Sequence, residues 1–146
     1  MLTFEGWTSQ LALRAGPSVI AFTKQNQLAI VTWCAFEGSP ALRNPLDATE
    51  GQPGSWPIKG NSAGVQNYTS IGEGFDAVLA TLHGHFGRYG PILEALAKGD
   101  CACSVTEAVA NSAWGTWSHN PAAASAAVTE VDKDYAAYAN RLVIGG

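Results

Sequence analysis

The predicted fold is decided by the stretch A-I-V-T-W-C-A-F-E-G, residues 29–38. Residues 23–37 contain no glycine or proline, and Gly38 follows directly. This pattern predicts a helix that ends at Glu37, with Gly38 in the left-handed position just beyond it. One face of the helix carries residues spaced at i, i+3, i+4 and i+7: Ile30, Trp33, Cys34 and Glu37. The helix therefore places a carboxyl group at the end of an apolar face.

Glu37 is the candidate catalytic residue. The last turn of a helix carries partial negative charge from its free carbonyl groups. Apolar neighbours such as Trp33 also disfavour an ionised carboxylate, so both effects should raise the pKa of Glu37. A carboxylic acid that is still protonated near neutral pH is what a general acid for glycosidic cleavage requires. The alternative is that Glu37 merely ends a helix and points into water.

Further motifs follow Glu37 in a fixed order. Residues 44–49 read N-P-L-D-A-T, residues 63–68 read A-G-V-Q-N-Y, residues 72–86 form a glycine-led helical pattern, and residues 112–116 read S-A-W-G-T. With E-G at 37–38, this series resembles the lysozyme-like superfamily, in particular its soluble lytic transglycosylase and goose-type lysozyme branch. It is most similar to small lysozyme-like domains of actinobacterial phages, from Trp7 to Trp117. One departure is Gly38, where many transglycosylases carry serine.

The resemblance implies an α+β, mostly α, lysozyme-like fold, with helices around a central catalytic helix and a small irregular β-sheet at the cleft. It implies cleavage of the β-1,4 bond between N-acetylmuramic acid and N-acetylglucosamine in peptidoglycan, by a lytic transglycosylase or a muramidase. Glu37 would be the catalytic acid and base. Gln66, Asn67 and Tyr68 match a family turn that contributes to the substrate cleft. Trp114 and Trp117 are cleft candidates, with burial in the core as the equal alternative.

A second carboxyl group is not evident from the sequence. Most glycosidases use two, but the possible partners of Glu37, namely Asp47, Glu50 and Glu73, lie in no motif that singles one out. We interpret them as loop or cap residues, and Asn44 and Thr49 as residues that fix the loop. One Glu is enough for a transglycosylase, in which a substrate hydroxyl attacks the anomeric carbon. Hydrolysis by Glu37 with a water held by a loop is the alternative.

Composition and charge limit the partners. The formal net charge is −4 and no basic run is present, which argues against nucleic acid because phosphate binding requires clustered Lys and Arg. The expected partners are peptidoglycan glycan strands and, for a virion-associated protein, other phage tail proteins. The alternative function is a non-catalytic structural virion protein that uses the same fold for assembly or cell-wall binding.

The N-terminus has neither the basic nor the apolar region of a signal peptide. No apolar run approaches the roughly 20 residues of a membrane span. We therefore expect synthesis in the host cytoplasm and action at the cell wall, as a lysin or as part of a virion, without a membrane partner.

Cysteine and histidine spacing predicts neither a metal site nor a cofactor. Cys101 and Cys103 are too close for an ordinary structural disulfide and do not form a C-x-x-C motif, so we expect them and Cys34 to be free thiols. His83 and His85 would point to different faces of a helix. A Cys34-dependent peptidase is disfavoured, because nucleophilic cysteines are usually activated at helix N-termini.

The 146 residues predict one domain, 1–146. Further helices are expected at 8–15, 70–86, 91–98 and from 104, with capping boxes S-x-x-E at 70–73 and 104–107. Prolines make regular structure unexpected between Gly38 and Ala63, and a short strand is expected at 63–68. The last helix is expected from Pro121 to Leu142, within a C-terminal element at 121–146. Its apolar and tyrosine stripe faces either its own core or a neighbouring protein.

Overall fold

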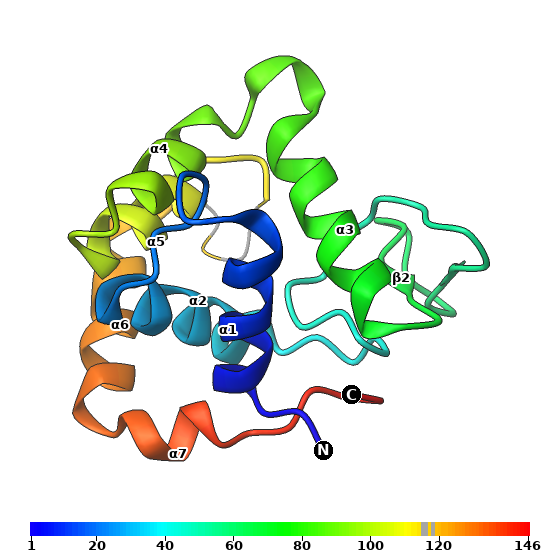
Figure 1. Ribbon diagram of the computed structural model, residues 1–146, viewed down its shortest axis with the longest axis horizontal. Helices are drawn as coiled ribbons and strands as arrows, with labels where there is room; N and C mark the ends of the chain where they lie inside the picture. The colour runs from blue at the N-terminus through cyan, green and yellow to red at the C-terminus, as the bar shows by residue number, and fades with distance from the viewer. Residues whose placement is uncertain (115–116, 118) are drawn as a thin grey trace.

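The computed structural model describes residues 1–114, 117 and 119–146, and these residues are mostly helical with one small sheet (Figure 1). The helices, in chain order, are α1 (Phe4–Ala15), α2 (Lys24–Glu37), α3 (Ile71–His83), the 3-10 turn η1 (His85–Gly87), α4 (Gly90–Lys98), α5 (Ala102–Ala110), α6 (Pro121–Lys133) and α7 (Tyr135–Ala139). Strands β1 (Trp56–Pro57) and β2 (Gln66–Asn67) pair antiparallel, with Trp56 opposite Asn67. The predicted α+β, mostly α, class is confirmed.

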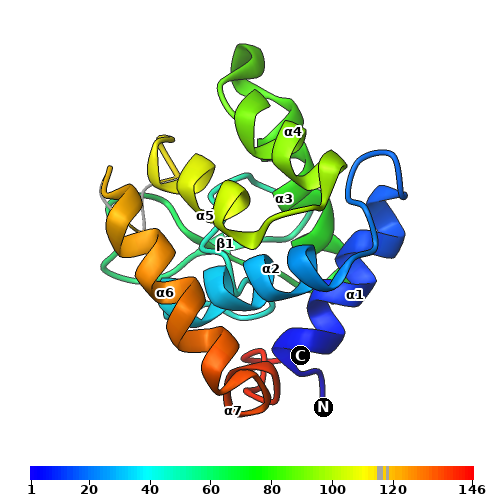
Figure 2. The same cartoon turned by 90° about the vertical axis from the view of Figure 1, so that its left-hand side faces the viewer.

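Helix α2 lies at the centre of the molecule and packs against α1 on one side and α5 and α6 on the other (Figure 2). The Thr23 side chain accepts a hydrogen bond from the amide of Asn26 at 3.1 Å and begins the helix. Gly38 ends it in the left-handed region at φ 59°. Trp33 and Cys34 are fully buried. The predicted helix and its end at Glu37 are therefore confirmed.

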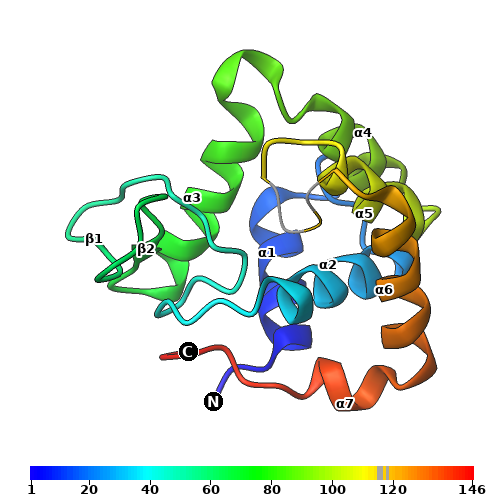
Figure 3. The same cartoon turned by 180° about the vertical axis from the view of Figure 1, so that it is seen from behind.

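Residues 38–70 form a mostly irregular lobe beside α3, on the side of α2 away from α6 (Figures 1 and 3). Of the strand predicted at 63–68, only Gln66 and Asn67 are paired, and their partner β1 lies where no regular structure was expected. Helix α3 approaches this lobe closely at Gly74, where a Cβ atom would overlap the carbonyl oxygen of Arg43. A side chain at this position would therefore push α3 away from the lobe.

Two predicted helix starts are wrong. Helix α1 begins at Phe4 and not at Thr8, because the Thr3 hydroxyl accepts a hydrogen bond from the Gly6 amide at 3.0 Å.

Helix α5 begins at Ala102, so the capping box predicted from Ser104 is also wrong. The Ala102 amide donates to Oε1 of Gln25 at 2.9 Å. A side chain of α2 thus satisfies the first amide of α5, and no local capping motif is needed.

Two predicted helix ends also differ. Helix α3 ends at His83, so the helix predicted at 70–86 is three residues too long at its C-terminal end. Phe86 lies beyond the helix at φ 56°, and its side chain is fully exposed. The last helix divides at Asp134 (φ −136°, ψ 52°) into α6 and α7 instead of continuing to Leu142.

The C-terminal element packs on the rest of the chain. Val128 and Val131 are buried, and Tyr135 and Tyr138 pack partly buried against the same hydrophobic core. The two ends of the chain lie side by side (Figure 1), where the Phe4 amide donates to the Arg141 carbonyl oxygen at 2.8 Å. None of the described helices has both the length and the apolar character needed to cross a lipid bilayer.

Candidate active site

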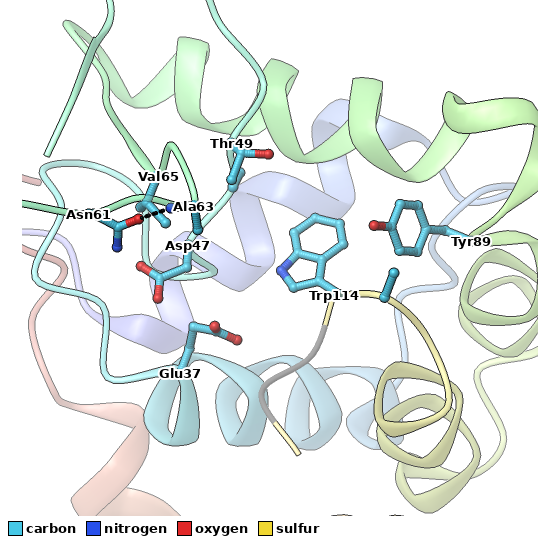
Figure 4. A pocket seen from close by; sticks show the side chains of 10 residues that line it. Glu37, Asp47, Thr49, Asn61, Ala63, Val65, Tyr89 and Trp114 are labelled. Carbon is cyan, nitrogen blue, oxygen red and sulfur yellow. Dashed lines mark hydrogen bonds between the residues drawn. The ribbon is translucent and has the colours of Figure 1, made fainter. Parts of the chain in front are cut away.

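A pocket of about 360 Å³ opens above the end of α2, between the irregular lobe and the segment that follows α5 (Figure 4). Its apolar lining comes from four small side chains: Ala48, Ala63, Val65 and Ala113. Its polar and aromatic lining is contributed by Glu37, Asp47, Thr49, Asn61, Tyr89 and Trp114. Such a mixture of apolar surface and a few convergent polar groups is typical of a ligand-binding site.

Glu37 lies at the floor of this pocket, half-buried at the last residue of α2. The indole Nε1 of Trp33, one turn earlier, donates to Glu37 Oε2 at 3.2 Å. Burial, and next the negative charge of Asp47, raise the pKa of Glu37 from 4.5 to about 8. The Trp33 hydrogen bond opposes this rise, whereas a hydrogen bond to Asp47 favours the protonated form. Glu37 is therefore a carboxylic acid at neutral pH.

Asp47 is the second carboxyl group of the pocket. Its backbone is in the left-handed region at φ 55°, and its carboxyl group lies directly across from Glu37 (Figure 4). Burial raises the pKa of Asp47, while hydrogen bonds from Ser39 and Glu37 act in the opposite direction. Its Oδ1 atom is buried with no hydrogen-bond partner among the described residues. Asp47 therefore lies in a loop, as interpreted, but it also lines the pocket, which contains a pair of carboxyl groups.

Asn44 fixes the loop that presents Asp47. Its Nδ2 group donates to the carbonyl oxygens of Ala48 and Gln66 at 2.9 and 2.7 Å, and its Oδ1 accepts the Ala48 amide at 2.8 Å. The Asn44 side chain is itself buried. These bonds close the turn at 44–48 and tie it to β2, which confirms the prediction that Asn44 bonds local backbone.

The same loop holds the aromatic wall of the pocket. Trp114 Nε1 donates to the Leu46 carbonyl oxygen at 2.7 Å. The Trp114 ring meets Trp33 edge to face at 4.9 Å and Tyr89 at 5.5 Å between ring centroids. Figure 4 shows the Tyr89 hydroxyl directed toward Trp114 and the pocket, and this hydroxyl makes no hydrogen bond within the described part of the chain. Trp114 thus lines the pocket, as predicted, in a firmly fixed orientation.

The other residues predicted to bind substrate lie elsewhere. The Gln66 side chain bonds within the irregular lobe, and Asn67 Oδ1 accepts the Leu42 amide at 2.9 Å. Tyr68 is fully buried, and its hydroxyl donates to the Glu50 carbonyl oxygen at 2.7 Å. None of the three lines the pocket. Gln66, Asn67 and Tyr68 thus support the lobe, and their contact with substrate stays a prediction.

Sequence reasoning did not single out Asn61 and Tyr89, and it gave Thr49 only a role in the loop. Asn61 opens the stretch N-S-A-G-V-Q-N-Y at 61–68, which could have marked it, whereas Tyr89 lies in an irregular segment with no periodic pattern. Glu73 is a cap, as predicted, since its carboxylate accepts the Thr69 amide at 2.9 Å. Trp117 is buried, and Gly115 and Thr116 of the S-A-W-G-T motif lie outside the described residues.

No group of three or more His, Cys, Asp or Glu side chains in the described ranges could hold a metal ion. All three cysteines are free thiols, as predicted. Comparison of the chain with protein-family models, curated proteins and solved structures gives no match. The chemistry of the pocket and the sequence motifs therefore indicate the function.

Proposed function

We propose that this chain has a lysozyme-like fold and is a peptidoglycan-cleaving glycosidase in which Glu37 is the general acid. One observation carries the proposal: a carboxyl group with a pKa of about 8 at the floor of an open pocket. At neutral pH this group holds a proton that it can donate to a glycosidic oxygen. The resemblance to lysozyme-like domains supplies the substrate, the β-1,4 bond between N-acetylmuramic acid and N-acetylglucosamine.

The lining of the pocket suits a sugar chain. Trp114 offers an aromatic surface for the apolar face of a pyranose ring. Thr49, Asn61 and Tyr89 offer hydroxyl and amide groups that can bond ring hydroxyls and the N-acetyl group. These groups stand around Glu37 and would orient the scissile bond over its carboxyl group.

Cleavage would begin with transfer of the Glu37 proton to the leaving oxygen as the bond to the anomeric carbon breaks. The Glu37 carboxylate would then accept a proton from the incoming nucleophile. If that nucleophile is the 6-hydroxyl of the same muramic acid residue, the product is an anhydro sugar, as in a lytic transglycosylase. If it is water, the product is a reducing end, as in a muramidase.

Asp47 would hold the proton on Glu37 until substrate binds. In other glycosidases the second carboxyl group is about 5–9.5 Å from the first, which leaves room for a sugar or a water. Asp47 instead acts on the pKa of Glu37 itself, by its negative charge and by hydrogen bonding. The charge of Asp47 and the hydrogen bond that it accepts both favour protonated Glu37, so we assign Asp47 a positioning role rather than the role of nucleophile.

The test is mass spectrometry of muropeptides released from purified actinobacterial peptidoglycan by the wild type and by Glu37→Gln. Anhydro ends from the wild type alone would establish a lytic transglycosylase, and reducing ends from the wild type alone would establish a hydrolase. Equal release by both proteins would refute the role of Glu37. Release by neither would favour the alternative, a non-catalytic virion protein.

A further inference from the structure

The turn that joins α3 to α4 holds two adjacent non-glycine residues in the left-handed region, His85 at φ 54° and Phe86 at φ 56°. Residues with a side chain rarely adopt this conformation, because it brings the Cβ atom too close to the following carbonyl oxygen. Both side chains are exposed, so burial of apolar surface does not explain the arrangement. Backbone strain of this kind persists only where its surroundings determine it, and it clusters at functional sites.

The two strained residues differ in what they contact. The His85 imidazole meets the ring of Tyr89 edge to face, with 5.9 Å between the ring centroids and an interplanar angle of 83°. Phe86 is fully exposed and makes no aromatic contact with any of the described residues. The left-handed backbone thus brings one ring of the turn onto Tyr89 and leaves the other in solvent.

Tyr89 is buried, and its side chain lines the pocket of the candidate active site. Its backbone is fixed, since its carbonyl oxygen accepts the amides of Ile92 and Leu93 at 3.1 and 3.2 Å. Its ring has two aromatic neighbours, Trp114 at 5.5 Å and His85 at 5.9 Å between centroids. Its hydroxyl is directed toward the pocket (Figure 4). Packing of the ring, rather than a hydrogen bond to the described residues, therefore sets the direction of this hydroxyl.

We propose that His85 is a positioning residue for glycan binding, which holds the Tyr89 ring so that its hydroxyl is already directed into the pocket when a sugar binds. The occupant of the pocket is taken to be a glycan strand, so this role of His85 rests on the proposed function. A side chain that is held in advance loses less freedom when the ligand binds, whereas immobilising a free side chain costs affinity. The strained backbone at His85 is then the means by which an exposed turn brings a ring against a buried tyrosine.

The test measures dissociation constants for peptide-free glycan strands of alternating N-acetylglucosamine and N-acetylmuramic acid, followed by tryptophan fluorescence. Every variant carries Glu37→Gln, so that strands bind without being cleaved. We expect His85→Ala to raise Kd by about 2- to 10-fold, the factor that corresponds to one newly immobilised side chain. His85→Phe keeps an aromatic ring at this position and should restore most of the affinity. Phe86→Ala is the matched control from the same strained turn and should leave Kd unchanged.

Two further comparisons separate positioning from a merely structural role. In Tyr89→Phe, which lacks the hydroxyl, the added change His85→Ala should have no further effect on Kd, because both changes act on the same group. In the chain that retains Glu37, His85→Ala should raise KM by the same factor and leave kcat unchanged. A loss of folded protein would instead lower kcat and leave KM unchanged.

The role of His85 would be overturned by equal Kd values for His85→Ala and its parent, by no restoration in His85→Phe, or by an equal effect of Phe86→Ala. A further rise of Kd in Tyr89→Phe, or failure of the parent to bind glycan, would overturn it as well. Glycan binding by the parent without cleavage by the wild type would refute the proposed glycosidase function alone, since the ratio of dissociation constants would still establish the role of His85.

Discussion

Replacement of Glu37 by Gln should stabilise the protein at neutral pH. Glutamine has nearly the shape of protonated glutamic acid, and its amide can donate to Asp47 as the Glu37 hydroxyl does, but it cannot ionise. In the wild type the folded chain keeps the Glu37 proton up to a pKa of about 8, whereas the unfolded chain releases it near 4.5. Between these two values the folded state binds more protons, so the wild type loses stability as the pH rises.

The size of this stability difference follows from the interval between the pKa of Glu37 in the unfolded chain and its pKa in the folded chain. Each pH unit corresponds to about 1.36 kcal/mol, so the interval from 4.5 to about 8 amounts to at most about 5 kcal/mol. We expect wild type and Glu37→Gln to have similar free energies of unfolding at about pH 4, where Glu37 is neutral in both the folded and the unfolded wild type. The variant should become progressively more stable above that pH, and the difference should become constant above about pH 8.

The assay is urea unfolding at several pH values, followed by the fluorescence of the five tryptophans. The matched control is Glu94→Gln, whose side chain is 72% exposed and pairs with Lys98 at 3.7 Å. That change should alter stability by less than about 1 kcal/mol at every pH. A difference between wild type and Glu37→Gln that does not change with pH would refute the assignment of a neutral acid at this position.

Three further changes test the pocket. Asp47→Asn removes the charge that favours protonated Glu37, so the alkaline limb of the pH profile of kcat/KM should move to lower pH, and an unmoved limb would contradict the role of Asp47. Asn44→Ala leaves buried backbone groups unpaired and should cost about 2–4 kcal/mol in urea unfolding; a cost below about 1 kcal/mol would show that the loop does not depend on Asn44. Tyr89→Phe should change stability by less than about 0.5 kcal/mol but raise KM for glycan several-fold, and an unchanged KM would place the hydroxyl outside the substrate site.

The features that could be predicted from the sequence are those that depend on interactions between residues close together in the chain. The helix that ends at Glu37 depends on its uninterrupted run of helix-compatible residues, and its end depends on Gly38 in the left-handed region at φ 59°. The loop-fixing role of Asn44 was equally accessible, since two of its three hydrogen bonds join it to Ala48, four residues along the chain. Even the upward shift in the pKa of Glu37 agreed in direction, although its causes are burial and Asp47 more than the helix end.

Features that depend on distant contacts could not be predicted. The start of α5 is set by Gln25, a residue from another helix, and local capping rules do not include such a partner. Asp47 faces Glu37 across the pocket with its backbone at a positive φ, which its sequence neighbours do not demand. The motif at 66–68 marked residues important to the lobe, but a motif does not tell a residue that binds substrate from one that supports the loop.

The 44–48 turn explains how a costly pair of carboxyl groups is kept together. Burial disfavours an ionised carboxylate at both Glu37 and Asp47, and the positive φ of Asp47 adds backbone strain of about 1–3 kcal/mol at most. Such an arrangement persists only if its surroundings determine it. The three hydrogen bonds of Asn44 fix the turn, and the carbonyl oxygen of Leu46 holds Trp114 against the other side of the pocket. The turn at 44–48 thus positions both Asp47, the partner of Glu37, and Trp114, the aromatic wall of the pocket. A substitution that distorts this turn should therefore change both the pKa of Glu37 and the proposed sugar-binding surface.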